Sequence, residues 1–388
     1  MEWKKYRLGC LSLSIQTGPF GSQLHQSDYS EEGTPVIMPK DMAEGRILED
    51  NIARVSDIHV QRLKRHKVKF GDVVYSRRGD VGRCALVGKN EEGWLCGTGC
   101  LKVELDKEKV LPSFLFYILQ RNDSVGWVEN HAVGSTMPNL NTGILAKLPV
   151  FLPSLNLQHR IASILSTYDS LIENNTKRIS LLEKMAENLY KEWFVRFRFP
   201  GYEKVEMENG LPKGWRRGSL SEICEFKRGK NITSNEMKEG LVPVISAGIT
   251  PSGFHSEANV YGTSVTMSSS GANAGYIAVH YSDIWAADCS YIEETTTPYI
   301  YYVYELLNNI RSVINNFQRG AAQPHVYPKD INRIKLIIPS EDLRKKANDR
   351  MVVIHKEIDN LQHQNTLLAR QRDLLLPRLM SGKLEVKP

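Results

Sequence analysis

The sequence has no apolar run long enough to span a bilayer, and it does not open with the apolar segment of a secretion signal. These absences argue against a membrane protein and predict a protein of the cytoplasm. The six cysteines are scattered, and only Cys96 and Cys100 lie close together. A zinc site would need two such pairs or neighbouring histidines, so we expect reduced thiols and no bound metal.

Motifs of catalysis are also missing. The sequence has no Gly-x4-Gly-Lys-Ser/Thr loop for a nucleotide, no His-Glu-x-x-His and no Gly-x-Ser-x-Gly. It also lacks the Asn/Asp-Pro-Pro-Tyr/Phe motif of amino-methyltransferases. The segment from Gly18 to Gly21 is not expected to be a cofactor loop, because no apolar strand precedes it. The sequence therefore predicts a protein without catalytic residues or a cofactor of its own.

The composition is that of an ordinary globular protein, with 41% hydrophobic, 24% charged and 9% aromatic residues. A chain of 388 residues suits two or three domains, each long enough to bury a core. The formal net charge of +6 is mild. It permits binding to nucleic acid without requiring it, so the distribution of the cations matters more than their sum.

The most informative feature is an internal repeat. Residues 134–154 match residues 320–340 without a gap, and each landmark, such as Pro138 with its counterpart Pro324, recurs 186 residues later. This distance indicates duplication of a whole domain, since solenoid repeats are only some tens of residues long. Two similar domains on one chain suggest a ligand with two similar parts.

Each copy has the pattern of a mixed domain with short strands and helices. Strand-forming runs bounded by glycines occur at residues 69–76, 84–87, 241–246, 264–268 and 276–280. Helical stretches are expected at residues 112–120 and 298–317. The sequence thus predicts two copies of one α+β domain.

Each copy is followed by a segment without glycine or proline, at residues 154–199 and 340–376, which predicts a long helix. Apolar residues in the first segment alternate steps of three and four, as in a coiled-coil seam, and the second seam keeps the pattern with two polar exceptions. Asn175 and Asn365 lie on these seams. Paired across antiparallel helices they would fix the register, and two independently solvated asparagines are the alternative.

We therefore expect an α+β fold with two tandem domains, each followed by a long helix. The two helices are expected to pair as an antiparallel coiled coil with pseudo-twofold symmetry. The expected boundaries are residues 1–152 for the first domain, 153–200 for the first helix, 201–338 for the second domain, and 339–388 for the second helix and its tail.

Short motifs along the whole chain carry a resemblance to one family. The motifs lie at residues 17–22, 71–82, 134–140, 211–215 and 376–384. Together with the order of domains and helices, they resemble the specificity subunits of type I restriction-modification systems. The second domain departs from this pattern, because residues 268–271, Ser-Ser-Ser-Gly, stand in place of the turn Arg77-Arg78-Gly79.

The resemblance implies a DNA-reading scaffold that is not an enzyme. Each target-recognition domain would read one half of a bipartite site in double-stranded DNA, and the helices would set the unread gap and dock two methylation subunits. Two restriction (motor-nuclease) subunits can join such a complex, and the isolated chain can associate with itself. S-adenosylmethionine, ATP and magnesium would be bound by these partners and not by this chain.

Side chains that neutralise phosphate or hydrogen-bond base edges are candidates for contact with DNA. In the first domain the candidates are Phe20, Ser22, Lys64, Arg65, Lys67, Arg77, Arg78, Ser135, Thr136 and Asn139. In the second domain they are Lys227, Arg228, Lys230, Ser269, Asn273, Arg319, Gln323 and His325. A cationic run can also be a merely solvated surface, and the polar residues beside the two repeated prolines can be turn caps.

Other functions stay open at this stage. Apolar residues outside the first seam, such as Leu181 and Met185, either pack on the chain's own domains or receive a partner. The alternatives to DNA recognition are a coiled-coil scaffold or orphan specificity chain without active partners, and a DNA methyltransferase acting alone. Binding of S-adenosylmethionine would support the methyltransferase. A salt-insensitive interaction would support the scaffold, because DNA affinity falls steeply as salt rises.

Overall fold

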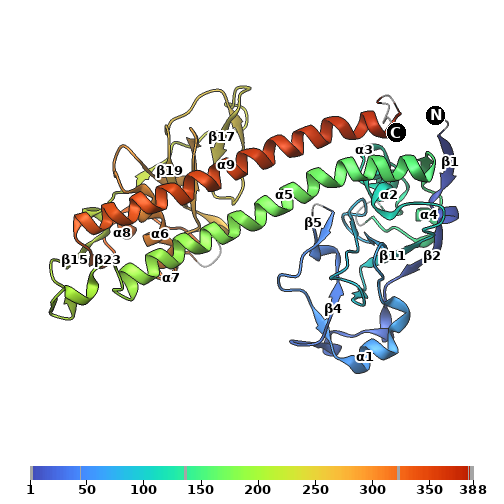
Figure 1. Cartoon of the computed structure of the whole chain (residues 1–388), viewed down its shortest axis with the longest axis horizontal. Helices are drawn as coiled ribbons and strands as arrows, with labels where there is room; N and C mark the ends of the chain where they lie inside the picture. Colours follow the sequence, from blue (N-terminus) through green and yellow to red (C-terminus); the bar gives the residue numbers. More distant parts are fainter. Residues whose placement is uncertain (1–2, 44, 135–137, 321–323, 383, 385–388) are drawn as a thin grey trace. The chain divides into compact units, whose positions relative to one another are not determined.

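The computed structural model describes residues 3–43, 45–134, 138–320, 324–382 and 384, and it divides into two compact units (Figure 1). Unit 1 comprises Met1–Ile172 with Leu367–Pro388, and unit 2 comprises Glu173–Thr366. The two long helices are shared between the units, whereas each named strand belongs to a single unit.

Unit 1 contains a four-stranded antiparallel sheet. Successive side chains of a strand point to opposite faces. In the central strand, Leu101 and Val103 therefore enter the main core of the unit, while Cys100 enters a smaller cluster on the other face. The strands in sheet order are β2 (Ser12–Thr17), β11 (Cys100–Leu105), β8 (Val73–Ser76) and β9 (Cys84–Leu86).

Smaller sheets and short helices complete unit 1. A second sheet has the order β10 (Leu95–Cys96), β4 (Thr34–Ile37), β7 (Arg54–Val55) and β3 (Tyr29–Ser30). Two-stranded pairs are β1 (Lys4–Arg7) with β12 (Pro149–Leu152), and β5 (Met42–Ala43) with β6 (Arg46–Ile47). The helices are α1 (Asp57–Arg62), α2 (Pro112–Leu119), α3 (Asn122–His131) and α4 (Thr142–Leu145).

Unit 2 repeats this arrangement. Its four-stranded sheet has the order β16 (Lys227–Arg228), β22 (Cys289–Glu293), β19 (Ser264–Ser268) and β20 (Ile277–His280). A second sheet has the order β18 (Gly253–His255), β17 (Val242–Ile245) and β21 (Trp285–Ala286). Two-stranded pairs are β15 (Arg216–Ser219) with β23 (Lys335–Ile338), and β13 (Met207–Glu208) with β14 (Leu211–Pro212). The prediction of two copies of one α+β domain is confirmed.

The helices of unit 2 differ from the sequence prediction in one place. The stretch expected as a single helix at residues 298–317 is two helices, α6 (Ile300–Asn309) and α7 (Arg311–Asn315), and α8 (Pro328–Ile331) follows later. The break lies at Ile310, whose backbone angles, φ −98° and ψ 15°, fall outside the helical range.

The two predicted long helices are α5 (Leu155–Tyr190) and α9 (Glu341–Met380). A π-helical turn, Lys191–Val195, extends α5. The segment without glycine or proline ends at residue 376, so the sequence predicted that the second long helix stops there. In the structure α9 continues through Pro377 to Met380. A proline in the last turn removes one hydrogen bond, and burial of Leu379 and Met380 in the core of unit 1 offsets that loss.

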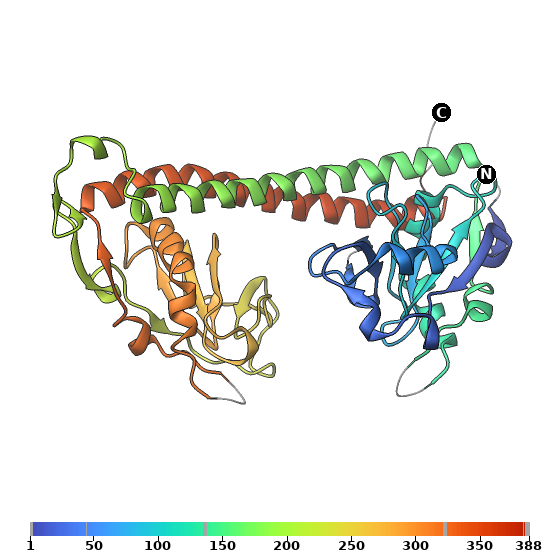
Figure 2. The same cartoon turned by 90° about the horizontal axis from the view of Figure 1, so that it is seen from below.

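Within each unit the segments of α5 and α9 lie side by side and antiparallel (Figures 1 and 2). In unit 2, Asn175 of α5 contacts Gln364 of α9, and Arg178 pairs with Glu357 at 2.7 Å, so the numbering rises on one helix while it falls on the other. In unit 1 the pair of Asp169 with Arg372 joins the same two helices. The predicted antiparallel pairing is confirmed.

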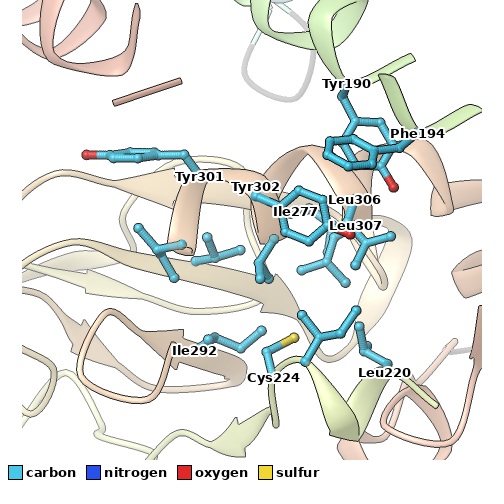
Figure 3. Close-up of a cluster of buried hydrophobic side chains, with 14 of the residues drawn as sticks. Tyr190, Phe194, Leu220, Cys224, Ile277, Ile292, Tyr301, Tyr302, Leu306 and Leu307 are labelled. Carbon is cyan, nitrogen blue, oxygen red and sulfur yellow. The ribbon is translucent and has the colours of Figure 1, made fainter. Parts of the chain in front are cut away.

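The core of unit 2 joins the helices to the sheet (Figure 3). Tyr190, the last residue of α5, and Phe194, in the π-helical turn that follows, pack against Tyr302 of α6. The rings of Phe194 and Tyr302 lie 5.0 Å apart, edge to face. Fully burying an aromatic or aliphatic side chain contributes about 1.5–3 kcal/mol. The aromatic end of the first helix is therefore an integral part of this domain core.

The six cysteines are unpaired, and all but Cys10 are buried. Burial raises the pKa of the Cys84 thiol to about 12, which keeps it protonated. Their reduced state stays a prediction. Among the described residues, no helix is both long and apolar enough to cross a membrane.

Candidate nucleic-acid interface

The predicted residues that follow the strands of unit 1 emerge at one end of the sheet, here called the loop edge. Strands β2 and β8 both run antiparallel to β11, so their last residues, Thr17 and Ser76, lie beside its first residues, Cys100 and Leu101. The chain that leaves β2 and the chain that leaves β8 therefore start from the same edge of the sheet.

The Arg77-Arg78 turn at this edge is held by the segment that contains Asn139. Arg78 forms an antiparallel bridge with Asn139, and the N–H of Leu140 donates to the carbonyl of Arg77 at 2.8 Å. The Arg77 guanidinium lies 5.9 Å from the centre of the exposed Phe20 ring, within cation–π range. Arg78 is exposed, and in the part of the chain that the structure describes neither arginine forms an ion pair. This turn presents two uncompensated cations.

A buried lysine anchors the backbone of the basic segment of unit 1, residues 64–67. Lys102, on β11, is only 4% exposed, and its ammonium donates to the carbonyls of Arg65 at 3.2 Å and Lys67 at 2.9 Å. Lys64 and Arg65 are exposed, and neither pairs with a carboxylate among the described residues. Anchored backbone with exposed cationic side chains suits contact with phosphate.

Two further buried groups stabilise this segment. Burial lowers the pKa of His66 to about 4, and the neutral ring accepts a hydrogen bond from Arg65 Nε at 3.0 Å. Asp72 is buried too, which raises the pKa of its carboxyl group, and it accepts the backbone N–H of Lys69 at 2.9 Å. The chain on either side of Lys67 is therefore held by side-chain contacts.

The corresponding loop edge of unit 2 is the end of its sheet where β16 and β19 end beside the start of β22. It repeats the backbone hydrogen bonds of unit 1. The N–H of Gly271 donates to Pro324 at 3.0 Å, as Gly79 does to Pro138 at 3.3 Å, and Ser270 forms a bridge with His325 as Arg78 does with Asn139. The glycines have φ values of +73° and +74°, a left-handed conformation that disfavours other residues. The serine turn therefore occupies the position of the arginine turn, as predicted.

The serine side chains point inward. Ser269 is fully buried, and its hydroxyl lies 3.4 Å from that of Ser290. Ser270 is 5% exposed and hydrogen-bonds the carboxylate of Asp288. The Ser269 side chain is therefore not accessible for contact with DNA in this arrangement, because strand packing encloses it. Asn273, after the turn, is half-buried.

Most of the candidate cations of unit 2 are paired with carboxylates, whereas the candidate cations of unit 1 form no ion pair among the described residues. Ion pairs join Lys227 to Glu293 at 2.6 Å, Arg228 to Asp288 at 2.7 Å and Arg319 to Asp330 at 2.8 Å. The hydrogen bond to Glu293 raises the pKa of Lys227.

Aromatic rings accompany the remaining candidates of unit 2. The ammonium of Lys230 lies 5.9 Å from the centre of the Trp285 ring. The rings of His325 and Tyr327 are nearly parallel, with centroids 6.2 Å apart. The side chain of Ser22, and all of Ser135, Thr136 and Gln323, lie outside the described residues.

Comparison with known proteins identifies the family. The sequence model of one protein family, the type I restriction modification DNA specificity domain, matches residues 2–184 and 212–369. The chain belongs to this family. The resemblance that the motifs indicated is thereby confirmed, and each matched stretch contains one loop edge.

Individual relatives cover nearly the whole chain. It is 26% identical to the type I restriction enzyme MjaIX specificity subunit of Methanocaldococcus jannaschii, over 93% of this chain and 89% of that one. It is 22% identical to the HindI specificity subunit of Haemophilus influenzae, over 99% and 100%. A crystal structure of a type I restriction-modification S subunit from M. genitalium covers 98% of this chain and 96% of its own, with 22% identity and a TM-score of 0.63, so the fold is shared.

The two seam asparagines lie next to each other in the helix pair of unit 2. Asn175 Nδ2 donates to Gln364 Oε1, and Asn365 Nδ2 donates to Thr176 Oγ1, both at 3.5 Å. Each asparagine thus reaches the residue beside the other. Their role in fixing the register stays a prediction.

Two residues that hold the candidate side chains in place, Lys102 and Asp288, were not predicted from the sequence. Lys102 stands between Leu101 and Val103 in a strand whose other charged residue is Glu104, and a lysine between two apolar residues is a signal that could have been noticed. Asp288 gave no such signal, because its two partners, Arg228 and Ser270, are 60 and 18 positions away in the sequence. Their contacts depend on strand register.

Proposed function

We propose that this specificity chain reads a bipartite site in duplex DNA as a non-catalytic subunit of a type I restriction-modification complex in the cytoplasm. The loop edge of each unit contacts one half of the site, and α5 and α9 set the unread gap. Two methylation subunits dock on the helices, and two motor-nuclease subunits can join them. These partners bind S-adenosylmethionine, ATP and magnesium.

One observation carries this proposal: the same backbone frame recurs at the two loop edges with different side chains. Gly79 and Gly271 make the same turn, yet Arg78 stands before one and Ser270 before the other. To read two different half-sites, two similar domains need the same backbone with different side chains on it. Base edges in the major groove are distinguished by hydrogen bonds from such side chains.

Charge supports a nucleic-acid partner for unit 1. Lys64, Arg65 and Arg78 are exposed and without carboxylate partners among the described residues. Phosphate contacts of this type supply much of the affinity for DNA and position the protein on it.

Exposed apolar side chains on the helices support docking of protein partners. In unit 2, Leu181 and Met185 of α5 are 60% and 56% exposed, one helical turn apart. Apolar patches of this type mark interaction surfaces. The residues at the end of α5, by contrast, pack into the domain core.

The test is to map adenine methylation by sequencing in cells that express the cognate methylation subunit with and without this chain. A two-part motif with an unread gap, present only with the chain, is the expected result. Replacing both Arg77 and Arg78 with Gln should alter or abolish one half of the motif. The matched control is Arg216→Gln, which removes a cation paired with Glu222 in the two-stranded sheet of unit 2.

Other results would point to other functions. Methylation that does not change with the chain indicates an orphan subunit or a protein scaffold. Binding of S-adenosylmethionine by the isolated chain indicates a methyltransferase.

A further inference from the structure

The loop edge of unit 2 lacks arginines in its turn, and its guanidinium comes from another strand. Gly229 donates its N–H to Cys289 at 2.9 Å, as Gly18 does to Cys100 at 2.9 Å, so the two glycines are equivalent. Arg228, the last residue of β16, therefore occupies the position of Thr17 in unit 1. Across the central strand from it, Ser270 occupies the position of Arg78.

Asp288 connects these two positions. Its Oδ1 accepts a hydrogen bond from Arg228 Nη2 at 2.7 Å, and its Oδ2 accepts one from the buried hydroxyl of Ser270. The backbone carbonyl of Asp288 also accepts the N–H of Ser269 at 3.4 Å. The carboxylate is thus fixed by the turn on one side and holds the arginine on the other, while the arginine side chain stays 44% exposed.

We propose that Asp288 is a positioning residue that aims the Arg228 guanidinium at a guanine in the half-site read by unit 2. This inference rests on the proposed function. One hydrogen bond to Asp288 leaves other donors of the planar guanidinium available, and O6 and N7 of guanine accept two parallel bonds. A guanidinium already held in one orientation loses less conformational freedom when it binds.

The competing role for Asp288 is simple neutralisation of Arg228, and the two roles predict different results. If the carboxylate only screens the arginine, removing its charge should strengthen binding to every duplex. If it positions the arginine, removing its charge should weaken the preference for guanine at one base pair, whatever happens to total affinity.

The neighbouring ion pair provides a matched control. Lys227 and Glu293 are 2.6 Å apart, and Lys227 precedes Arg228 on β16, so alternation puts the two side chains on opposite faces of the sheet. Asp288→Asn and Glu293→Gln remove the same charge from adjacent pairs. A difference in base preference between the two variants therefore reports on the orientation of Arg228.

The experiment measures the complex of the full chain with its methylation subunit on a library of randomised duplexes, scoring the preference for each base at each position. Asp288→Asn should lower discrimination at one G·C pair of one half-site by about ten-fold or more, and leave the other half unchanged. Arg228→Lys keeps the charge but loses the planar guanidinium with its two parallel donors, so it should lower discrimination at the same pair. Glu293→Gln should keep the wild-type motif.

Several outcomes would overturn the inference. If Asp288→Asn keeps the full motif or acts like Glu293→Gln, the carboxylate only neutralises Arg228. Should Asp288→Asn fail to fold, Arg228→Lys decides: unchanged discrimination means a phosphate contact without base reading. A wild-type complex that selects no motif overturns the proposed function together with this inference, whereas a wild-type motif that survives both variants overturns the inference alone.

Discussion

Arg372 of α9 forms an ion pair with Asp169 of α5, with Nη1 and Oδ1 2.7 Å apart. Arg372 is one of the polar residues on the predicted apolar seam of the second helix. Asp169 also accepts a hydrogen bond from the hydroxyl of Tyr117, on α2. The exception in the seam therefore joins both long helices to the domain of unit 1.

Replacing Asp169 with Ala should destabilise unit 1. It leaves the hydroxyl of Tyr117, a buried residue, without its acceptor and removes one of the two carboxylates that pair with Arg372. A buried unpaired polar group costs about 1–3 kcal/mol. Denaturant unfolding measures the loss. The control is Asp373→Ala, which removes an exposed partner of the same arginine and should cost no more than about 0.5 kcal/mol. Equal losses in the two variants would contradict the role assigned to Asp169.

His66 should make the stability of the chain depend on pH. Burial lowers its pKa to about 4, below the ordinary value of 6.5, so between these values the unfolded chain binds more protons than the folded one. The stability associated with the neutral, buried His66 ring is therefore fully present above pH 6.5, and it is lost from the free energy of unfolding as the pH falls towards 4. We expect His66→Gln to reduce the loss of unfolding free energy between pH 7 and pH 5 by about 1–2 kcal/mol. The exposed His25, replaced with Gln, serves as the control, and a pH profile identical in wild type and His66→Gln would refute this account.

Lys102→Met should weaken DNA binding although Lys102 does not face solvent. It leaves the carbonyls of Arg65 and Lys67 without their donor, and the basic segment loses its fixed conformation. We expect an affinity several-fold lower in fluorescence titrations with duplex DNA. Lys107→Met is the control, because its ammonium donates to the carbonyl of Phe70 at 2.8 Å from an exposed position. If both variants bind alike, only charge matters at this site.

Salt should affect the cations of the two units differently. Each phosphate contact contributes about 0.9 to the slope of log affinity against log salt. Arg78→Gln should lower that slope by about this amount, since the arginine has no carboxylate partner among the described residues. Lys227→Gln should lower it less, because Glu293 already neutralises the lysine at 2.6 Å. Binding isotherms at several salt concentrations test the difference, and a larger effect at Lys227 would reverse the assignment.

The regular elements of the fold could be predicted from local pattern. The helix expected at residues 112–120 is Pro112–Leu119, and the strand expected at residues 264–268 has those bounds. A proline at a helix start and an alternating β-branched run are local signals. The long helices were equally visible, because the absence of glycine and proline is a property of the sequence itself.

The site could be predicted only in part. Cations and turns are visible in the sequence, but burial and pairing are set by the register of strands far apart in the chain. Ser269 was a candidate for contact with DNA and is enclosed, since the turn directs its side chain to Ser290. Arg228 was a candidate for contact with DNA, and its pairing with Asp288, 60 residues away, could not be predicted from the sequence.

The glycines that end β2 and β16 have one more consequence. A side chain on Gly18 would clash with the carbonyl of Gly97, and one on Gly229 with the carbonyl of Ala287, so the backbone there tolerates no change. The same frame accepts Arg78 in one unit and Ser270 in the other. Backbone structure and DNA specificity are thus separable in this chain: the side chains at the turns can change while the backbone conformation that the glycines enforce stays fixed.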